Sequence, residues 1–300
     1  MSFLKQLIKK IPMIGNLYKE LEIHKKGFPP GHYYSPIISE LEVTAHADKI
    51  FSKTQLLTGI DLNKEEQLNL LYTLQKYYSE VPYKEFRNPG LRYYFNNNTF
   101  EYSDAIFLNA MMRNFSPKKI IEIGSGFSSA VMLDTNDIFF KSSIDLTFIE
   151  PYPQRLQSLL HKDDIAQFTL IEKNLQDVPS ELFTTLNAGD ILFVDSTHVS
   201  KTGSDVNMIL FQILPELQKG VIIHFHDIFF PFEYPKEWVL GWSGFGWNEI
   251  YLLRAFLMNN KEYKIILFNT YLEEIEENWV RVNMPLCLKD RGGSLWLQKI

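Results

Sequence analysis

The chain has 300 residues, of which 45% are hydrophobic and 22% are charged, and its formal net charge is −6. This composition is ordinary for a globular protein, and the acidic balance argues against nucleic acid as a partner, because nucleic-acid-binding domains usually present a basic face. Cys287 is the single cysteine, so no intramolecular disulfide can form, which is usual in the reducing cytoplasm. We therefore expect a cytoplasmic protein, and no apolar run is long enough to predict a membrane-spanning helix.

The first residues of the chain repeat apolar side chains at helical spacing. The predicted apolar face contains Phe3, Leu4, Leu7, Ile8 and Ile11, and lysines stand beside it at positions 5, 9 and 10. These lysines interrupt the apolar run, which argues against a signal peptide. Two alternatives remain open: a helix that packs on the body of the protein, which is the simpler one, or a peripheral contact with a membrane surface.

Up to residue 117 the sequence predicts helices and loops, which we interpret as an N-terminal extension and cap over residues 1–117. Helices are expected at 64–81 and 102–115, where apolar residues recur at helical spacing. Ser103 is expected to cap the second helix, and Pro117 follows its end.

From residue 118 the pattern alternates between strands and helices, and residues 118–300 are predicted to form one α/β domain. Strands are expected at 120–123, 146–150, 168–172, 190–195, 220–226, 264–269 and 294–299, and helices at 127–135, 153–161, 179–187, 204–219 and 247–260. The nearly continuous apolar character of the strands is typical of a parallel sheet covered on both faces, and the alternation indicates a doubly wound architecture. The segment between the last two strands is too irregular for a crossover helix, so the last strand is expected to run antiparallel.

A glycine-rich turn follows the first strand, in the stretch KKIIEIGSGFSS. Gly124, Ser125 and Gly126 form a G-x-G turn, as in dinucleotide sites, but Ser129 replaces the third glycine of such motifs. Glu122 precedes the turn, and a carboxylate there would repel a diphosphate and attract a positively charged ligand. S-adenosylmethionine carries an ammonium and a sulfonium beside an adenosine, so we interpret the turn as a site for this cofactor.

Glu150 ends the second predicted strand at the same edge of the sheet. An acidic residue in this place accepts hydrogen bonds from ribose hydroxyls, which NAD and S-adenosylmethionine share. The alternative is an exposed carboxylate that favours the start of the next helix.

Several stretches together resemble a known family. IIEIGSGFSS, TFIEPYP, DILFVDSTHVSKTGSDV and GVIIHFHDIFFPFEYP are similar to the successive motifs of class I S-adenosylmethionine-dependent methyltransferases, and FPPGHYYSPI resembles the subgroup of sugar and natural-product O-methyltransferases. The resemblance covers most of the chain and implies seven strands in the order 3-2-1-4-5-7-6, with the last strand antiparallel. It also implies that the segment after the third strand contacts adenine, for which Gln176 is the candidate.

Asp195 ends the fourth strand, and His198 follows three residues later. Ligands of open α/β sheets bind at the carboxyl ends of the strands, near the switch in strand order that the first and fourth strands flank. Asp195 is expected to meet the methionine ammonium, to bind a metal, or both. His198 is predicted to be the base that takes a proton from an acceptor hydroxyl, because an imidazole titrates near neutral pH. A solvated loop side chain is the alternative for His198.

The fifth strand ends in HFHD, which supplies His224, His226 and Asp227. By resemblance to metal-dependent O-methyltransferases, Asp195, His226 and Asp227 would hold a divalent ion, Mg²⁺ or another, that lowers the pKa of the acceptor hydroxyl. A nitrogen ligand departs from the all-oxygen set expected for Mg²⁺, and two structural histidines are the alternative. His224 is expected to be buried and hydrogen-bonded.

Further stretches are candidates for smaller roles. Ser204 is expected to cap the helix that follows it. The stretch GWSGFGWNE at 241–249 is interpreted either as a lid over the acceptor or as a packed loop, and 28–34 and 92–94 as candidate walls of the acceptor site.

These features predict an enzyme that transfers a methyl group from S-adenosylmethionine to a hydroxyl of a small molecule or a sugar, with His198 as base. Two alternatives remain: a metal-dependent hydroxylase-like relative on the same scaffold, and a methyltransferase-like protein that binds a partner without catalysis. The presence of Asp195 and His198 argues against the second. The sequence specifies neither the acceptor nor the oligomeric state.

Overall fold

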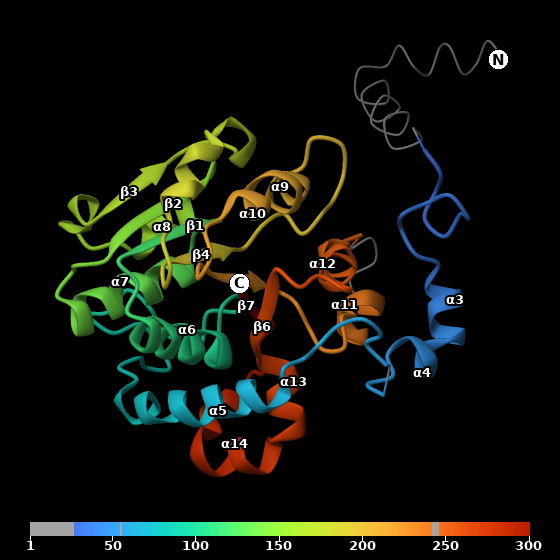
Figure 1. Ribbon diagram of the computed structural model, residues 1–300, viewed down its shortest axis with the longest axis horizontal. Coiled ribbons are helices and arrows are strands. Elements are labelled where there is room, and N and C mark those ends of the chain that lie inside the picture. Colours follow the sequence, from blue (N-terminus) through green and yellow to red (C-terminus); the bar gives the residue numbers. More distant parts are fainter. Residues whose placement is uncertain (1–26, 55, 242–245) are drawn as a thin grey trace, which may run out of the picture. The chain divides into compact units, whose positions relative to one another are not determined.

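The computed structural model describes residues 27–54, 56–241 and 246–300 (Figure 1). The amphipathic pattern expected in the first residues lies outside the described residues, as does part of the glycine- and tryptophan-rich stretch at 241–249. In the part of the chain that is described, no helix is both long and apolar enough to cross a bilayer.

Backbone contacts divide the chain into two compact units. The smaller unit comprises Met1–Ser52 and Pro235–Gly246, and the larger comprises Lys53–Tyr234 and Trp247–Ile300. The described helices of the smaller unit are α3 (Glu40–Ala45), α4 (Ala47–Ile50) and α11 (Lys236–Gly241).

The larger unit is built on a seven-stranded sheet. Its strands are β1 (Lys119–Ile123), β2 (Asp145–Ile149), β3 (Phe168–Ile171), β4 (Ile191–Val194), β5 (Ile222–His226), β6 (Tyr263–Phe268) and β7 (Ser294–Lys299). They lie in the order β3-β2-β1-β4-β5-β7-β6, and only the two pairings of β7 are antiparallel. The predicted fold class, strand order and antiparallel last strand are confirmed.

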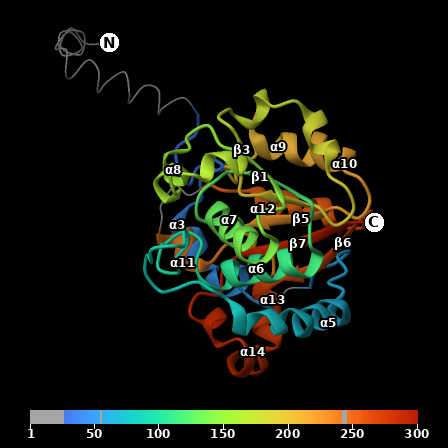
Figure 2. The same cartoon turned by 90° about the vertical axis from the view of Figure 1, so that its left-hand side faces the viewer.

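The central strands are buried because both of their faces are covered. Every residue of β4 and β5 is buried, and so are the last four residues of β1. Figures 1 and 2 show α6 and α7 together on one face of the sheet and α9 and α10 on the other. The helices of this unit are α5 (Lys64–Leu74), α6 (Tyr102–Phe115), α7 (Phe127–Phe140), α8 (Gln154–Leu159), α9 (Asp205–Met208), α10 (Leu214–Glu216), α12 (Glu249–Leu257), α13 (Asn269–Ile275) and α14 (Glu277–Asn283).

A few local predictions need correction. The helix expected at 179–187 is a 3₁₀ helix over Ser180–Thr185. Ser103 does not cap α6, because Glu101 occupies the N-cap position and the buried Ser103 hydroxyl donates to Glu273. Ser204 does cap α9, since its Oγ accepts a hydrogen bond from the Asn207 N–H at 3.3 Å.

Arg92 anchors the loop before α6 to the rest of the unit. Its side chain is 3% exposed and makes two hydrogen bonds to Asp164, at 2.6 and 2.7 Å, and one to Asp134, at 2.8 Å. Although burial by itself would raise the pKa of the Asp164 carboxyl, the hydrogen bonds from Arg92 lower it. Arg92 therefore has a structural role, which differs from its interpretation as a wall of the acceptor site.

Replacement of Arg92 by alanine is expected to destabilise the fold by about 3–5 kcal/mol, because it leaves buried carboxylates without their cationic partner. Urea denaturation followed by circular dichroism measures the loss. Arg281→Ala is the matched control: its pair with Glu277 is exposed, so it should cost less than about 1 kcal/mol. Equal losses in the two variants would contradict the anchoring role of Arg92.

Candidate active site

The carboxyl ends of β1, β2 and β4 bring three predicted site residues to one edge of the sheet. Gly124, Glu150 and Asp195 each follow directly after one of these strands. The backbone ladder continues past the strand ends, since the Gly124 N–H donates to the Ile149 carbonyl at 2.9 Å and the Asp195 N–H donates to the Ile123 carbonyl at 2.8 Å. All three residues line one cavity of about 290 Å³.

Gly124 is the point of closest approach between the turn and the neighbouring strand. Its φ is +83°, in the left-handed region, and a Cβ here would lie 2.1 Å from the carbonyl oxygen of Asp195. A glycine is therefore required for the chain to turn from β1 into α7 while the end of β4 keeps its place.

Glu150 ties the first two loops together. Its Oε2 accepts a hydrogen bond from the Ser125 N–H at 3.2 Å, and its Oε1 accepts one from the Tyr152 N–H at 2.7 Å. The Ser125 Oγ, by contrast, is buried and has no hydrogen-bond partner within the described residues. A buried hydroxyl of this kind is costly, so a ligand that bonds to it would gain that free energy.

The far side of the cavity is formed by the loop after β3. Gln176 lines it, and the Gln176 Nε2 donates to the Gly203 carbonyl at 2.8 Å, which joins this loop to the one before α9. Tyr152 also lines the cavity and is 74% exposed. Tyr152 was not predicted from the sequence, although its position two residues after Glu150 was an available signal.

Glu122 lies inside the fold and is not among the residues that line the cavity. Its carboxyl accepts hydrogen bonds from the hydroxyls of Ser128, at 2.5 Å, and Ser129. Burial raises the pKa of Glu122 to about 8, so the group is mostly protonated at neutral pH. The charge that the sequence analysis assigned to Glu122 is therefore not presented to a ligand, and Glu122 instead fixes the start of α7.

A second cluster of titratable groups surrounds His198. The His198 Nδ1 lies 2.8 Å from an oxygen of the buried Glu249, and its Nε2 lies 3.3 Å from Asp195 and 3.7 Å from Asp227. The Trp247 ring packs against the imidazole, with 4.2 Å between centroids. Glu249 and Trp247 belong to the stretch at 241–249 that was interpreted as a lid over the acceptor or a packed loop, but neither was named singly as a site residue.

The neighbouring carboxylates decide the charge of His198. Burial alone would lower its pKa, but the hydrogen bonds with Asp195 and Glu249 raise the pKa well above the usual value. In return, the His198 bond lowers the pKa of Asp195, against the effect of burial. His198 is therefore an imidazolium in this arrangement and cannot accept a proton until its pKa falls.

Two residues of this cluster have a strained backbone. His198 has a φ of +57° and Asp227 a φ of +56°, which places both in the left-handed region. For residues other than glycine this conformation costs about 1–3 kcal/mol, and it persists where the surroundings fix it. Their strain supports the interpretation of this cluster as a functional site.

Residues 121–228 match the family described as "Methyltransferase domain". This stretch of the chain is similar to methyltransferase domains. A curated protein from Archaeoglobus fulgidus, described as uncharacterized, is 41% identical over 169 residues, which make up 54% of this chain and 74% of that protein, so the chain belongs to the same family as the archaeal protein.

Solved structures of methyltransferases show weaker likeness. The Podospora anserina methyltransferase PaMTH1, bound to S-adenosylhomocysteine (SAH), is 16% identical, with coverage of 86% of this chain and 94% of that one and a TM-score of 0.43. The Streptomyces achromogenes O-methyltransferase TomG, in complex with S-adenosylmethionine, is 14% identical, with coverage of 86% and 96% and a TM-score of 0.41. At these identities and TM-scores the likeness says nothing about the activity of this chain. The fold is described by the strand order of the sheet itself.

The divalent-metal site predicted at Asp195, His226 and Asp227 is not supported. Among the residues that the structure describes, no group of three or more His, Cys, Asp or Glu side chains is arranged to hold a metal ion. The His198 Nε2 lies between the two carboxylates that would bind the ion, and its imidazolium already supplies a positive charge there.

The two histidines of β5 are buried, but among the described residues His224 lacks the hydrogen bond that was expected for it. His224 is buried, as predicted, and stacks on Phe193 with 3.9 Å between ring centroids, but neither of its ring nitrogens has a hydrogen-bond partner in the described part of the chain. Burial lowers the pKa of His224 well below its usual value, so its ring is neutral. His226 is 5% exposed, and its Nε2 lies 3.6 Å from the Asp227 carboxylate.

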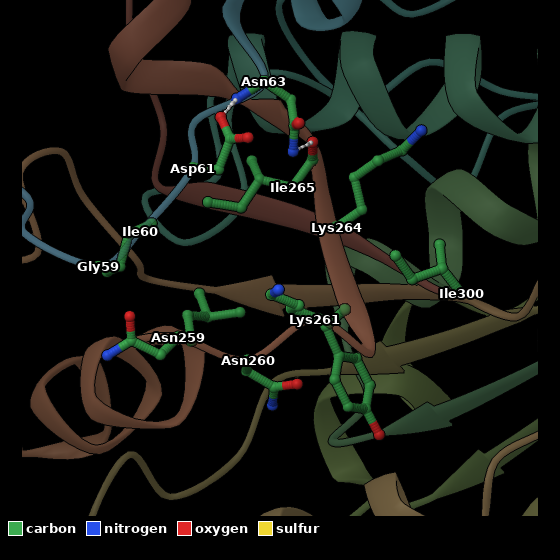
Figure 3. Close-up of a pocket in the computed structure, with 12 residues that line it drawn as sticks. Gly59, Ile60, Asp61, Asn63, Asn259, Asn260, Lys261, Lys264, Ile265 and Ile300 are labelled. Carbon is green, nitrogen blue, oxygen red and sulfur yellow. Dashed lines mark hydrogen bonds between the residues drawn. The ribbon is translucent and has the colours of Figure 1, made fainter.

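A second, larger cavity of about 620 Å³ lies beside β6, one of the two edge strands of the sheet (Figure 3). None of the predicted site residues lines it. Asn63 lies in its wall and donates to the Ile265 carbonyl at 3.3 Å, while the nearby Gln67 accepts from the Phe268 N–H at 2.7 Å. These side chains cover the outer backbone groups of β6, which protects an exposed sheet edge from pairing with another chain.

Substitution of Gly124 by alanine is expected to destabilise the methyltransferase domain by about 3 kcal/mol or more, because a left-handed backbone and a collision with the Asp195 carbonyl add together. Thermal and urea denaturation measure the effect. Gly203→Ala is the control: Gly203 has a φ of +73°, but no atom lies within 4 Å of its added Cβ, so only about 1–2 kcal/mol should be lost. Similar losses at both positions would show that the close approach does not matter.

The buried carboxyl of Glu122 is expected to make the stability of the domain depend on pH. Its pKa is about 8 in the folded state and 4.5 by the ordinary value, so the folded state binds more protons between these values. The stability that Glu122 contributes is then fully present below about pH 4.5. It is lost as the pH rises toward about 8, by an amount on the order of a few kcal/mol.

Glu122→Gln removes this titration. The free energy of unfolding of wild type relative to the variant should fall between about pH 5 and about pH 8, as measured by chemical denaturation without ligand. Glu172→Gln, which changes an exposed carboxylate after β3, should show no such trend. A pH-independent difference between wild type and Glu122→Gln would exclude the proposed protonation.

Proposed function

We propose that this chain transfers a methyl group from S-adenosylmethionine to a hydroxyl group of a small-molecule acceptor. The observation that carries the proposal is the meeting of Glu150 and Asp195 in one cavity beneath the Gly124 turn. The similarity of residues 121–228 to methyltransferase domains supports the reaction class, and the donor and the acceptor class belong to the proposal.

The residues of the cavity fit this donor. Glu150 is the candidate for the ribose hydroxyls and Asp195 for the methionine ammonium, and both line the cavity. The buried Ser125 hydroxyl, on the turn beside Gly124, is the candidate for a further polar contact. Gly124 and Gly126 allow the backbone to approach the ligand, and Gln176 remains the candidate for the adenine end. The lowered pKa of Asp195 keeps its carboxylate charged, so Asp195 and Glu150 now supply the negative charge that disfavours a diphosphate.

The acceptor end is assigned to the cluster around His198. When bound, S-adenosylmethionine would supply an electrophilic methyl group, whose sulfur–carbon bond breaks as the oxygen–carbon bond forms, with S-adenosylhomocysteine as the leaving group. The acceptor oxygen must lose its proton in the same transfer. His198 is the candidate base once its pKa has fallen. A ligand ammonium beside Asp195 offsets the carboxylate charge that now raises this pKa, so donor binding itself favours the neutral imidazole.

Isothermal titration calorimetry with SAH tests the donor site. We expect one molecule bound per chain, no comparable binding of NAD⁺, and at least tenfold weaker binding by Glu150→Ala, because hydrogen bonds to a charged group contribute about 1.5–3 kcal/mol. Glu172→Ala removes an exposed strand-end carboxylate outside the cavity and should bind as wild type does. Tight NAD⁺ binding with no response to SAH would refute the proposal.

Labelled methyl transfer to a panel of hydroxylated small molecules tests the acceptor end. His198→Ala is expected to abolish transfer and to retain SAH binding within about threefold, because His198 contacts the acceptor side of the site. Full activity of His198→Ala would remove the base assignment and leave the donor assignment in place.

A further inference from the structure

Glu249 is a buried carboxylate that links two residues of the loop after β4. It lies in the first turn of α12 and is 1% exposed. Its Oε1 accepts a hydrogen bond from the Ser196 hydroxyl at 2.9 Å, and Ser196 lines the cavity proposed for the methyl donor. Its Oε2 lies 2.8 Å from the His198 Nδ1, which is a hydrogen-bond distance. Each carboxylate oxygen of Glu249 is therefore matched to one partner, and His198 is one of the two.

The start of α12 also holds the main chain of His198. The N–H groups of Asn248 and Glu249 both donate to the His198 carbonyl, at 3.0 and 3.1 Å. The His198 N–H donates to the Ser196 Oγ at 2.9 Å. Main chain and side chain are thus both fixed, so the imidazole has one orientation, with its Nδ1 toward α12 and its Nε2 toward the aspartates that follow β4 and β5.

The exposure of the three surrounding carboxylates decides which ring nitrogen keeps its proton when His198 is neutral. The Glu249 side chain is 1% exposed, whereas the side chains of Asp195 and Asp227 are 37% and 15% exposed. A buried carboxylate that loses its hydrogen bond bears the full cost of its removal from water, whereas a partly exposed one regains bonds from water. The Nε2 contacts, at 3.3 and 3.7 Å, are also longer than ordinary hydrogen bonds. Loss of the Nε2 proton therefore costs less than loss of the Nδ1 proton.

We infer that Glu249 is a positioning residue that keeps the proton on the His198 Nδ1, so that Nε2 is the atom that takes the proton of the acceptor hydroxyl. The role in catalysis rests on the proposed function, but the position of the proton is a property of the chain without ligand. In the transfer, the hydroxyl proton moves to Nε2 as the oxygen–carbon bond forms and the sulfur–carbon bond breaks, so the positive charge passes from the sulfonium to the imidazolium beside Glu249. The acceptor hydroxyl then lies on the side of the ring that faces Asp195 and Asp227, away from α12.

Proton–nitrogen correlation NMR of the full chain with isotope-labelled histidine, recorded without ligand, tests the position of the proton. At a pH where the ring is neutral, His198 should show a protonated Nδ1 and an unprotonated Nε2, with His198→Ala used to identify its signals. Glu249→Gln should lose this preference, because an amide can donate to Nδ1 as well as accept from it. A wild-type ring with its proton on Nε2 would overturn the inference, and so would an unchanged preference in Glu249→Gln.

The kinetics of labelled methyl transfer supply the second measurement. Glu249→Gln should lower kcat about 100-fold or more, because a correctly oriented base contributes about 10²–10⁴-fold, and should leave the acceptor KM and the Kd of SAH within about threefold of wild type. Glu273→Gln is the matched control: Glu273 is fully buried and accepts from the Ser103 hydroxyl, but it lies on α13, outside the candidate site, so kcat should be retained.

Thermal denaturation of both variants shows whether they are folded, and the NMR measurement on the wild type does not depend on either of them. Wild-type kcat in a folded Glu249→Gln variant would overturn the positioning role. A wild-type chain that has its proton on Nδ1 but methylates no acceptor would refute the proposed function, while the position of the proton would be confirmed.

Discussion

The approach of the Gly124 backbone to the Asp195 carbonyl is the constraint on which the site depends. β1 and β4 lie side by side where the strand order reverses, so the loops that follow them diverge and leave a crevice at their carboxyl ends. Because Gly124 has no Cβ, the first loop can cross the end of β4 closely, and Glu150 then reaches the Ser125 N–H from the next strand. The close approach of these backbone segments thus sets the walls of the cavity.

Two acids have distinct roles around this crevice. Glu122 is removed from solvent, is mostly protonated at neutral pH and bonds to two serine hydroxyls, so it supports the turn without adding charge. Asp195 is kept ionised by His198 and lines the cavity. The buried carboxyl of Glu122 is thus neutral, whereas the partly exposed carboxylate of Asp195, directly after the adjacent strand, is charged.

Much of the fold could be predicted from the sequence because apolar runs and strand ends are local signals. The seven strands followed from such runs, and Gly124, Glu150 and Asp195 could be placed at one edge because parallel strands share their carboxyl ends. The direction of the Glu122 side chain could not be predicted, since a residue near the end of a strand points to the ligand or to the core depending on packing. The bond between Glu249 and His198 was also missed, because it joins residues 51 positions apart on different elements. This bond helps to raise the pKa of His198, and the resulting positive charge stands where the sequence had predicted a metal ion.

The groups proposed for the donor and those proposed for the acceptor come from different parts of the chain. Gly124, Glu150 and Asp195 all lie within the methyltransferase match at 121–228. Glu249 and Trp247, which hold His198 from the other side, lie beyond it. The sequence that defines the family therefore contains the groups proposed for the donor, whereas the orientation of the candidate base depends on a segment that the family match does not cover. Changes in that segment can alter the groups proposed for the acceptor while the backbone contacts around Gly124 stay intact. For this reason the sequence points to a particular methyl donor but not to a particular acceptor.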